Sequence, residues 1–268
     1  MSEEPDAKAD RQGRDPAPAV TRSMRILGLL AEASGPLTLT EIASGLGLAK
    51  SSTANLCLAL EAAMMVQRVP LGYQLGRRTI ELGGAYASQF SQVREFYTVC
   101  ETSPVLVHEV VQVAMLDDTE ALYLARHEGS RSVRFGTPLG SRLPAALSAT
   151  GNALLMAMED AEVAALLADQ APFPRLTDRS IRDIPDLLVK LAAARDRGWA
   201  LDDGESFPGI VGVAVPLEGW APSDPSLALG VALPVAEATP GRVASVAAAL
   251  VDAAARLTNP LSAGRTRD

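Results

Sequence analysis

The sequence predicts an α+β protein with a small N-terminal module and a larger C-terminal one. Hydrophobic residues make up 48% of the 268 residues, which is enough for two ordinary cores. The pattern is mostly helical in the first part and becomes a mixture of strands and helices from about residue 105. The charge also divides unevenly, because residues 20–78 hold six basic and three acidic residues whereas residues 79–268 carry a net charge of −9.

The composition excludes several classes of protein. A net charge of −8 excludes a uniformly basic nucleic-acid-binding protein but allows a local basic patch. Two cysteines and two histidines exclude a disulfide scaffold and a four-cysteine zinc site, so we expect no metal and no cofactor. No apolar stretch reaches about 18 residues and the N-terminus has no apolar core, so we expect no membrane contact, no signal peptide and a cytoplasmic location.

The N-terminal module begins after a polar segment, residues 1–18, that we expect to be a flexible tail. Ile26, Leu27 and Leu30 have helical spacing, and the segment 34–36 (SGP) ends that helix. Thr38 and Glu41 stand at the spacing of a capping box and predict a second helix. The glycines of the following GLG segment, residues 45–47, predict a tight turn.

A third helix is predicted from Lys50 to about Ala63, with Leu56 and Leu60 on its buried side. Strand-like residues 65–69, a turn at 70–72 and a returning strand at 73–75 follow. The order of helix, helix, short glycine turn, helix and hairpin is typical of a winged helix-turn-helix, which we assign to residues 19–76.

The rest of the chain predicts a linker helix at residues 77–97 and an α+β domain at residues 98–258. A hairpin is expected around residues 117–118, with a strand and then a loop over 132–144. Helices are expected over 148–170 (one or a pair), 185–197 and 240–257, and strands at 210–217 and 227–234. We expect residues 259–268 to be a second flexible tail.

Three blocks of the chain resemble the IclR family of transcriptional regulators. These are TRSMRILGLLAEASGPLTLTEIASGLGLAKSSTANLCLALEAAMMVQR, RFGTPLGSRLPAALSATGNALL and RGWALDDGESFPGIVGVAVPL, and their spacing also fits. The resemblance covers about residues 20–258. It implies a winged helix-turn-helix joined by a helix to a GAF-like effector-binding domain. It also implies a homo-oligomer, a dimer or a dimer of dimers, on a palindromic double-stranded DNA operator, and leaves the choice between repressor and activator open.

The third helix would then be the recognition helix. A helix N-terminus with hydroxyl side chains suits a phosphate, although simple helix capping by Ser51 and Ser52 is the alternative. Lys50 would add counterion release, and Asn55 could contact adenine in the major groove. Arg22 matches a family arginine that precedes the first helix. The predicted DNA-binding residues are Arg22, Lys50, Ser51, Ser52, Thr53, Asn55, Arg68 and Arg77.

Some positions depart from the family pattern. Ala54 and Asn55 stand where the family commonly has an aromatic residue or histidine and then arginine, which changes the expected operator preference. Met64 stands where the family usually has glycine. Solvated surface charge is the alternative role for Arg68 and Arg77.

In the C-terminal domain the resemblance places Asp202, within an acidic loop, at the effector pocket; a turn-forming acidic cluster is the alternative. Gly212 stands where the family frequently has cysteine or serine, and Gly230 and Ala232 stand where acid-binding members frequently have small hydroxyl residues. These smaller side chains predict empty volume and an effector larger or more apolar than glyoxylate. Arg131, Arg134 and Arg142 could still pair with a carboxylate; surface exposure is the alternative for each. The predicted effector-binding residues are Phe135, Thr150, Asp202, Gly212, Gly230 and Ala232.

The alternatives are a small-molecule-binding enzyme and a sensory module that does not bind DNA. The chain has no G-x-S-x-G elbow, and its nearest approach, residues 204–208, lacks the last glycine. It has neither G-x-G-x-x-G nor a P-loop, and neither His108 nor His127 has ligand spacing to a second histidine. Cys57 and Cys100 are expected to be structural. We therefore predict a regulator without catalytic residues.

Overall fold

A computed structural model describes residues 15–87, 91–130, 137–219 and 224–258. The chain divides into two compact units, Met1–Tyr86 and Ala87–Asp268, and each is described by itself. Both expected tails fall mainly outside the described residues, although Pro18, at the end of the first, already begins a helix.

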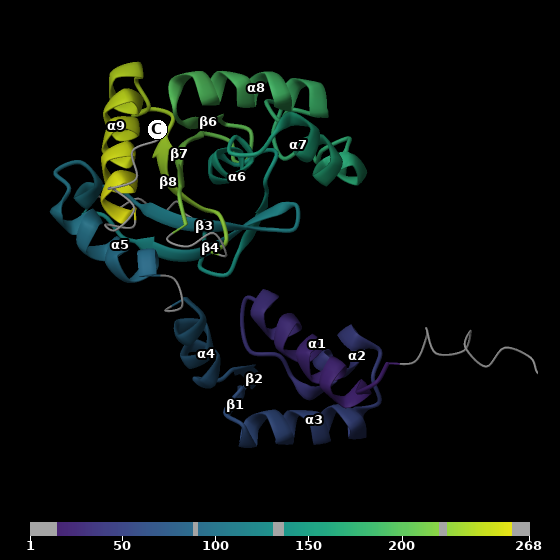
Figure 1. Ribbon diagram of the computed structural model, residues 1–268. Helices are drawn as coiled ribbons and strands as arrows, with labels where there is room; N and C mark the ends of the chain where they lie inside the picture. Colours follow the sequence, from purple (N-terminus) through teal and green to yellow (C-terminus); the bar gives the residue numbers. More distant parts are fainter. Residues whose placement is uncertain (1–14, 88–90, 131–136, 220–223, 259–268) are drawn as a thin grey trace, which may run out of the picture. The chain divides into compact units, whose positions relative to one another are not determined.

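The first unit is a winged helix-turn-helix, which confirms the predicted fold (Figure 1). Its core is formed by Ile26, Leu30, Ile42, Cys57 and Leu60. Leu27 and Leu56 are only partly buried at its edge. The elements are α1 (Pro18–Glu32), α2 (Leu39–Leu46), α3 (Lys50–Ala62), β1 (Val66–Val69), β2 (Gly72–Leu75) and α4 (Arg78–Ala87).

Local sequence signals fix the start and end of α2. The Thr38 hydroxyl accepts from the Glu41 amide at 3.3 Å, and the Glu41 carboxylate accepts from the Thr38 amide at 2.7 Å, so the capping box is confirmed. Gly47 ends the helix at φ +64, a conformation that glycine adopts without steric cost. This turn sets the direction in which α3 leaves the core.

The second unit is built on one six-stranded antiparallel sheet. Its strands are β3 (Val111–Asp117), β4 (Glu120–His127), β5 (Arg142–Pro144), β6 (Ala200–Asp203), β7 (Ile210–Leu217) and β8 (Leu227–Pro234). They lie in the order β5-β4-β3-β8-β7-β6. The predicted hairpin, the two late strands and the α+β class are confirmed.

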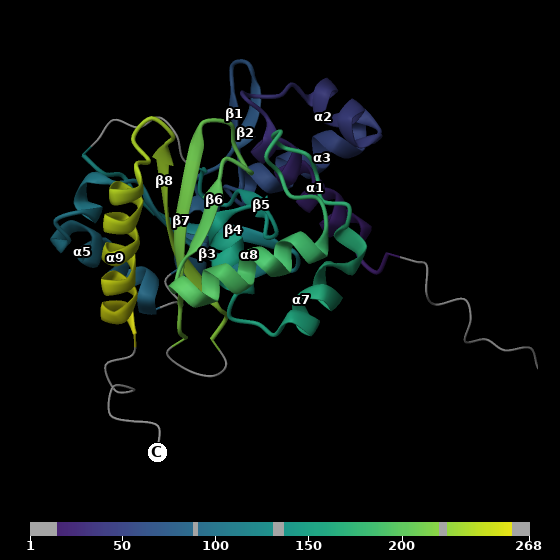
Figure 2. The same ribbon diagram turned by 90° about the horizontal axis from the view of Figure 1, so that it is seen from above.

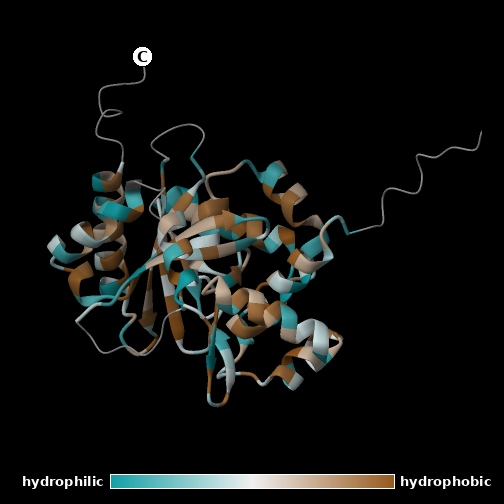
Figure 3. Cartoon of the chain, turned by 90° about the horizontal axis from the view of Figure 1, so that it is seen from below, coloured by the Kyte–Doolittle hydropathy of each residue, from teal (hydrophilic) through white to brown (hydrophobic). Residues whose placement is uncertain are grey.

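Helices cover both faces of this sheet (Figures 1 and 2). One face packs against α5 (Ser91–Thr102) and α9 (Pro240–Leu257), and the other against α6 (Ala149–Leu155) and α8 (Ile184–Arg197). Helix α7 (Asp160–Leu167) packs on α8, outside this layer. Short 3₁₀ turns occupy Leu106–His108 and Ala168–Gln170. Hydrophobic residues are frequent along the central strands (Figure 3).

Alternation along β7 and β8 gives the two faces different side chains. Large residues such as Val213, Leu229 and Val231 pack on the α9 side, whereas Ala214 and Ala228 pack on the α6 side. Small residues let α6 approach the sheet closely.

The structure corrects two sequence predictions and leaves a third untested. Asp202 and Asp203 belong to the edge strand β6, paired with β7, and not to a loop. In the segment 132–144 the described strand is β5 at its end, while residues 131–136 lie outside the described residues. Helix occupies both sides of the predicted linker helix, as α4 and α5, but residues 88–90 lie outside the described residues, so a single helix over 77–97 stays a prediction.

None of the helices in the described parts of the chain combines the length and the apolar character that crossing a membrane requires. Among the same residues, no group of three or more His, Cys, Asp or Glu side chains could hold a metal ion.

Candidate DNA-binding face and effector pocket

Helix α3 presents one exposed stripe. Its buried side is Thr53, Cys57 and Leu60, spaced at three and four residues. The opposite side holds Ser51 and Asn55 and continues over Leu58, Ala59 and Ala62. Lys50 is also exposed, at the first helical position. The exposed stripe is therefore polar at the N-terminal end of the helix and apolar at the C-terminal end.

One predicted DNA contact on this helix is wrong. Thr53 is fully buried, and its hydroxyl donates to the Ala49 carbonyl at 3.1 Å inside the unit. Its side chain cannot reach a duplex. Ser52 is half-buried, whereas Ser51 and Asn55 are exposed. Neither serine caps α3, because Ala49 is its N-cap residue and makes no side-chain cap hydrogen bond.

The predicted arginines lie at the edges of the unit. Arg22 is exposed but lies inside α1, so the expectation that it precedes the first helix is wrong. Arg68 on β1 stacks over Tyr73, with its guanidinium carbon 5.9 Å from the ring centroid. Arg77 follows β2 and donates to the Met64 sulfur at 2.8 Å. Met64 has φ +58, the left-handed region where glycine is less strained.

Sequence reasoning missed Leu58. Its side chain is 66% exposed on the stripe of α3, although an apolar residue at helical spacing predicts burial. The signal that could have identified it is its position seven residues after Ser51, which places both on one face. Apolar side chains on such a face can contact thymine methyl groups.

The described residues of the predicted effector set lie around one pocket in the second unit. Thr150 comes from α6, Asp202 from β6, Gly212 from β7, and Gly230 and Ala232 from β8. Phe135 lies outside the described residues, as do Arg131 and Arg134. Arg142 is not part of the lining and instead forms an ion pair with Asp117.

The predicted empty volume is not present. A Cβ built on Gly212 would lie 2.8 Å from the Ala149 Cβ, and one built on Gly230 would lie 2.6 Å from the Thr150 Cγ2. Helix α6 occupies the space that side chains at these two positions would fill. The remaining cavity measures about 50 Å³. The argument from small residues to a roomier cavity is therefore wrong, because a small side chain in a sheet also allows a helix to come closer.

Hydrogen bonds fix the polar side chains of the pocket. The Tyr123 hydroxyl lies 3.0 Å from the Thr150 hydroxyl. Asp202 is 5% exposed, and its Oδ1 accepts from the Glu205 amide at 2.6 Å and from the Ser206 amide at 3.3 Å. Burial raises the pKa of Asp202, while hydrogen bonds from the Ser206 hydroxyl and from these amides, together with the charge of Lys190, act against the rise.

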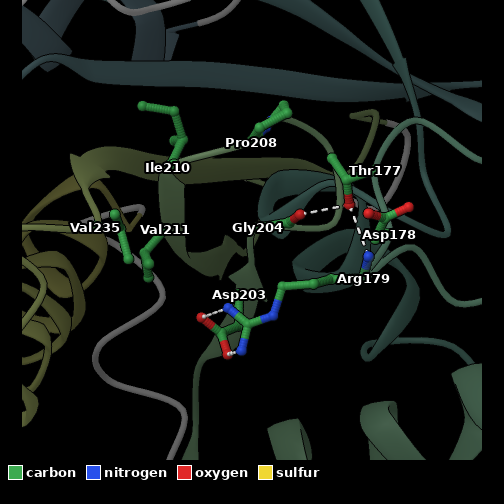
Figure 4. A pocket seen from close by; sticks show the side chains of 10 residues that line it. Thr177, Asp178, Arg179, Asp203, Gly204, Pro208, Ile210, Val211 and Val235 are labelled. Atoms are coloured by element: carbon green, nitrogen blue, oxygen red, sulfur yellow. Dashed lines mark hydrogen bonds and ion pairs between the residues drawn. The ribbon is translucent and has the colours of Figure 1, made fainter.

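The loop that follows β6 is held by α8 and by the segment 177–180, which precedes α8 in the chain. Lys190 on α8 contacts the Glu205 carboxylate at 2.5 Å, and the Ser180 hydroxyl donates to the Glu205 carbonyl at 2.8 Å. The Thr177 hydroxyl donates to the Gly204 carbonyl at 2.7 Å (Figure 4). These contacts leave the loop little freedom, so they also fix Asp202.

A second, larger space of about 380 Å³ lies on the outer side of the same loop (Figure 4). Arg179 and Asp203 form a two-fold ion pair on its wall, with N–O distances of 3.0 and 2.9 Å. Pro208 and Val235 provide apolar surface. None of the predicted effector residues that the structure describes lines this space.

Comparisons with known proteins agree on both units. Residues 19–70 match the family model of the IclR helix-turn-helix domain, and residues 97–259 match that of the bacterial transcriptional regulator IclR C-terminal domain. The chain is 30% identical over 205 residues to the HTH-type transcriptional repressor AllR of Salmonella paratyphi A, covering 76% of this chain and 75% of that protein. It is 31% identical over 196 residues to AllR of Escherichia coli, covering 72% of each.

Two solved structures are similar over nearly the whole chain. An IclR transcriptional regulator from Alicyclobacillus acidocaldarius superposes with a TM-score of 0.77 at 25% identity, covering 90% of this chain and 97% of that one. An IclR homologue from Microbacterium hydrocarbonoxydans, complexed with 4-hydroxybenzoate, has a TM-score of 0.76 at 25% identity, covering 92% and 100%.

Proposed function

Because this chain belongs to the IclR family of bacterial transcriptional regulators, we propose that it binds an operator through the exposed stripe of α3 and responds to a small organic effector in the pocket around Asp202. The observation that carries the DNA-binding part is the exposed N-terminal end of α3, where Lys50, Ser51 and Asn55 face outward. In helix-turn-helix proteins the N-terminal end of the recognition helix, which corresponds to α3 here, reaches the base edges of the major groove.

The exposed residues of α3 and the nearby arginines have proposed roles. Lys50 neutralises a phosphate, the Ser51 hydroxyl binds the backbone and Asn55 reads an adenine. Leu58 contacts a thymine methyl group farther along the groove. Arg22, Arg68 and Arg77 contact flanking phosphates, and Ser52 contributes only its partly exposed edge.

We propose a homodimer or a dimer of dimers on a palindromic operator in the cytoplasm, with no catalytic role for the C-terminal unit. The family membership supports the oligomer, since two-fold operators match two-fold proteins. The crystallised homologue with 4-hydroxybenzoate supports the binding of a small organic effector by this chain. An effector larger than glyoxylate would have to widen the cavity of about 50 Å³ by displacing α6 or the exposed Phe207.

Replacement of Lys50 by alanine is expected to weaken operator binding. It is also expected to lower the slope of log affinity against log salt concentration by about one unit, because each phosphate contact releases about one counterion. Fluorescence anisotropy titrations across several salt concentrations measure this slope. Arg175→Ala is the matched control, since it removes an exposed cation from the second unit, where it pairs with Asp178 at 2.7 Å. A slope equal to that of the wild type would remove Lys50 from the interface.

A further inference from the structure

We propose that the effector pocket selects an uncharged molecule whose polar end carries N–H or O–H donors, such as a primary carboxamide, in preference to a carboxylate. The inference rests on the proposed function, which makes the pocket around Asp202 the effector site. Three features carry it: the hydrogen-bonding groups that the pocket offers, the pairing of the described cations around it, and one buried hydroxyl beside Asp202.

The pocket offers acceptors to a ligand. Asp202 uses Oδ1 for two backbone amides, and its Oδ2 lies on the side of Gly212, 3.8 Å from where a Cβ of that residue would stand. The Gln112 Nε2 donates to the Thr137 carbonyl at 2.7 Å, which leaves the Gln112 Oε1 as an acceptor. A carboxamide can donate to both of these oxygens, whereas a carboxylate has no hydrogen to donate and would face a buried carboxylate.

Ser206 adds a further polar group beside Asp202. The residue is 4% exposed and lines the pocket. Its hydroxyl hydrogen-bonds the Asp202 carboxylate. A hydroxyl that donates to a carboxylate can still accept from a ligand N–H, so Ser206 is another acceptor.

The cations that the structure describes near the pocket are paired with carboxylates, while Arg131 and Arg134 lie outside the described residues. Among the described lining residues there is no lysine, arginine or histidine. Lys190, behind the loop, contacts Glu205 at 2.5 Å, and Arg126, beside Gln112, contacts Glu128 at 2.6 Å. A cation that is already paired attracts an incoming carboxylate less than a free one would. The closest negative charge to a ligand is therefore Asp202, which repels an anion.

Matched pairs of ligands that differ only in charge test this inference. Glycolamide and glycolate form a pair near the present size of the cavity, and 4-hydroxybenzamide and 4-hydroxybenzoate form a larger one. Thermal shift and calorimetry on the full-length protein without DNA, at about 10 mM ligand, are expected to show at least about tenfold tighter binding of an amide than of the matching acid. Ethanolamine, which carries an ammonium group in place of the amide, tests whether a cation is preferred instead. The proposal would be overturned if the acid bound more tightly than the amide, if ethanolamine bound more tightly than glycolamide, or if neither amide bound.

The variant Asp202→Asn identifies the source of the preference. Its side-chain carbonyl can still accept from the amides of Glu205 and Ser206, but the charge is gone. The preference for amide over acid is expected to fall about tenfold or to reverse. Asp203→Asn is the matched control, because Asp203 pairs with Arg179 and does not line this pocket, and it is expected to keep the preference. An unchanged preference in Asp202→Asn would contradict the assignment to Asp202.

An operator titration on the same preparations separates the two proposals. If the protein binds DNA but does not favour amides, the ligand inference alone fails. If it favours amides but no DNA fragment binds, the operator-binding part of the proposed function fails while the ligand class stands.

Discussion

A Lys190→Met variant is expected to lose about 3–5 kcal/mol of unfolding free energy, the cost typical of leaving one member of a buried ion pair without its partner. The side chains of Lys190 and Glu205 are 16% and 10% exposed, and they meet at 2.5 Å. Removing the ammonium leaves a carboxylate that the surrounding loop cannot solvate. Urea unfolding of the wild type and the variant, at equal slope, measures the loss.

The pH dependence of this loss follows from the pKa of Glu205. Burial already raises this pKa, against the effect of Lys190, and removal of the lysine raises it further. A buried carboxyl group with a raised pKa destabilises the folded protein only while it is ionised. The loss of unfolding free energy in Lys190→Met is therefore expected to be largest at neutral pH. It is expected to shrink as the pH falls through the pKa of Glu205 in the folded variant.

The double variant Lys190→Met/Glu205→Gln is the control. It removes both charges while an amide of similar shape remains, so most of the lost stability is expected to return. If the single variant stays within about 0.5 kcal/mol of the wild type, the ion pair does not hold the loop behind Asp202, and this part of the account is wrong.

An Asn55→Glu variant is expected to lose operator affinity by about a hundredfold or more. The substitution removes the proposed adenine contact and places a carboxylate on the stripe of α3, where phosphates and base acceptors would repel it. Asn55 is exposed and contributes nothing to the core of the unit, so the melting temperature is expected to change little. Anisotropy titrations with an operator fragment measure the affinity.

Ser34→Glu is the matched control for this variant. Ser34 is equally exposed but lies in the turn between α1 and α2, so a carboxylate there adds the same charge away from the stripe. It is expected to weaken binding only slightly. Equal losses in both variants would show a general charge effect and would argue against a direct contact at Asn55.

The fold followed from local signals in the sequence. The capping box of Thr38 and Glu41, the left-handed Gly47 and the helical spacing around Ile26 act over a few residues, so a sequence contains them in full. The edge strand β6 was missed because its four residues include two aspartates, which are unfavourable in strands. Its pairing with β7 is a tertiary contact that overrides this local preference.

The pocket was predicted in position but not in shape. The resemblance placed Thr150, Asp202, Gly212, Gly230 and Ala232 together, and all of them line one cavity. The closeness of α6 depends on how a helix packs on a sheet of small residues, which no local pattern shows.

The same limit explains Thr53 and Leu58 on α3. Their exposures, 0% and 66%, depend on which side of the helix meets α1 and α2, and the hydrophobicity of the two residues predicts the opposite assignment.

Cleavage of the operator by a reagent tethered to α3 tests the central claim most directly. The native thiols Cys57 and Cys100 are both buried, so a Ser51→Cys variant can be labelled selectively with iron-EDTA at its exposed position. We predict strand cleavage inside the bound site, at bases facing the recognition helix, and weak or no cleavage from the same label on Ser34→Cys. Strong cleavage from the label at residue 34, with none from residue 51 in a protein that still binds DNA, would contradict the account.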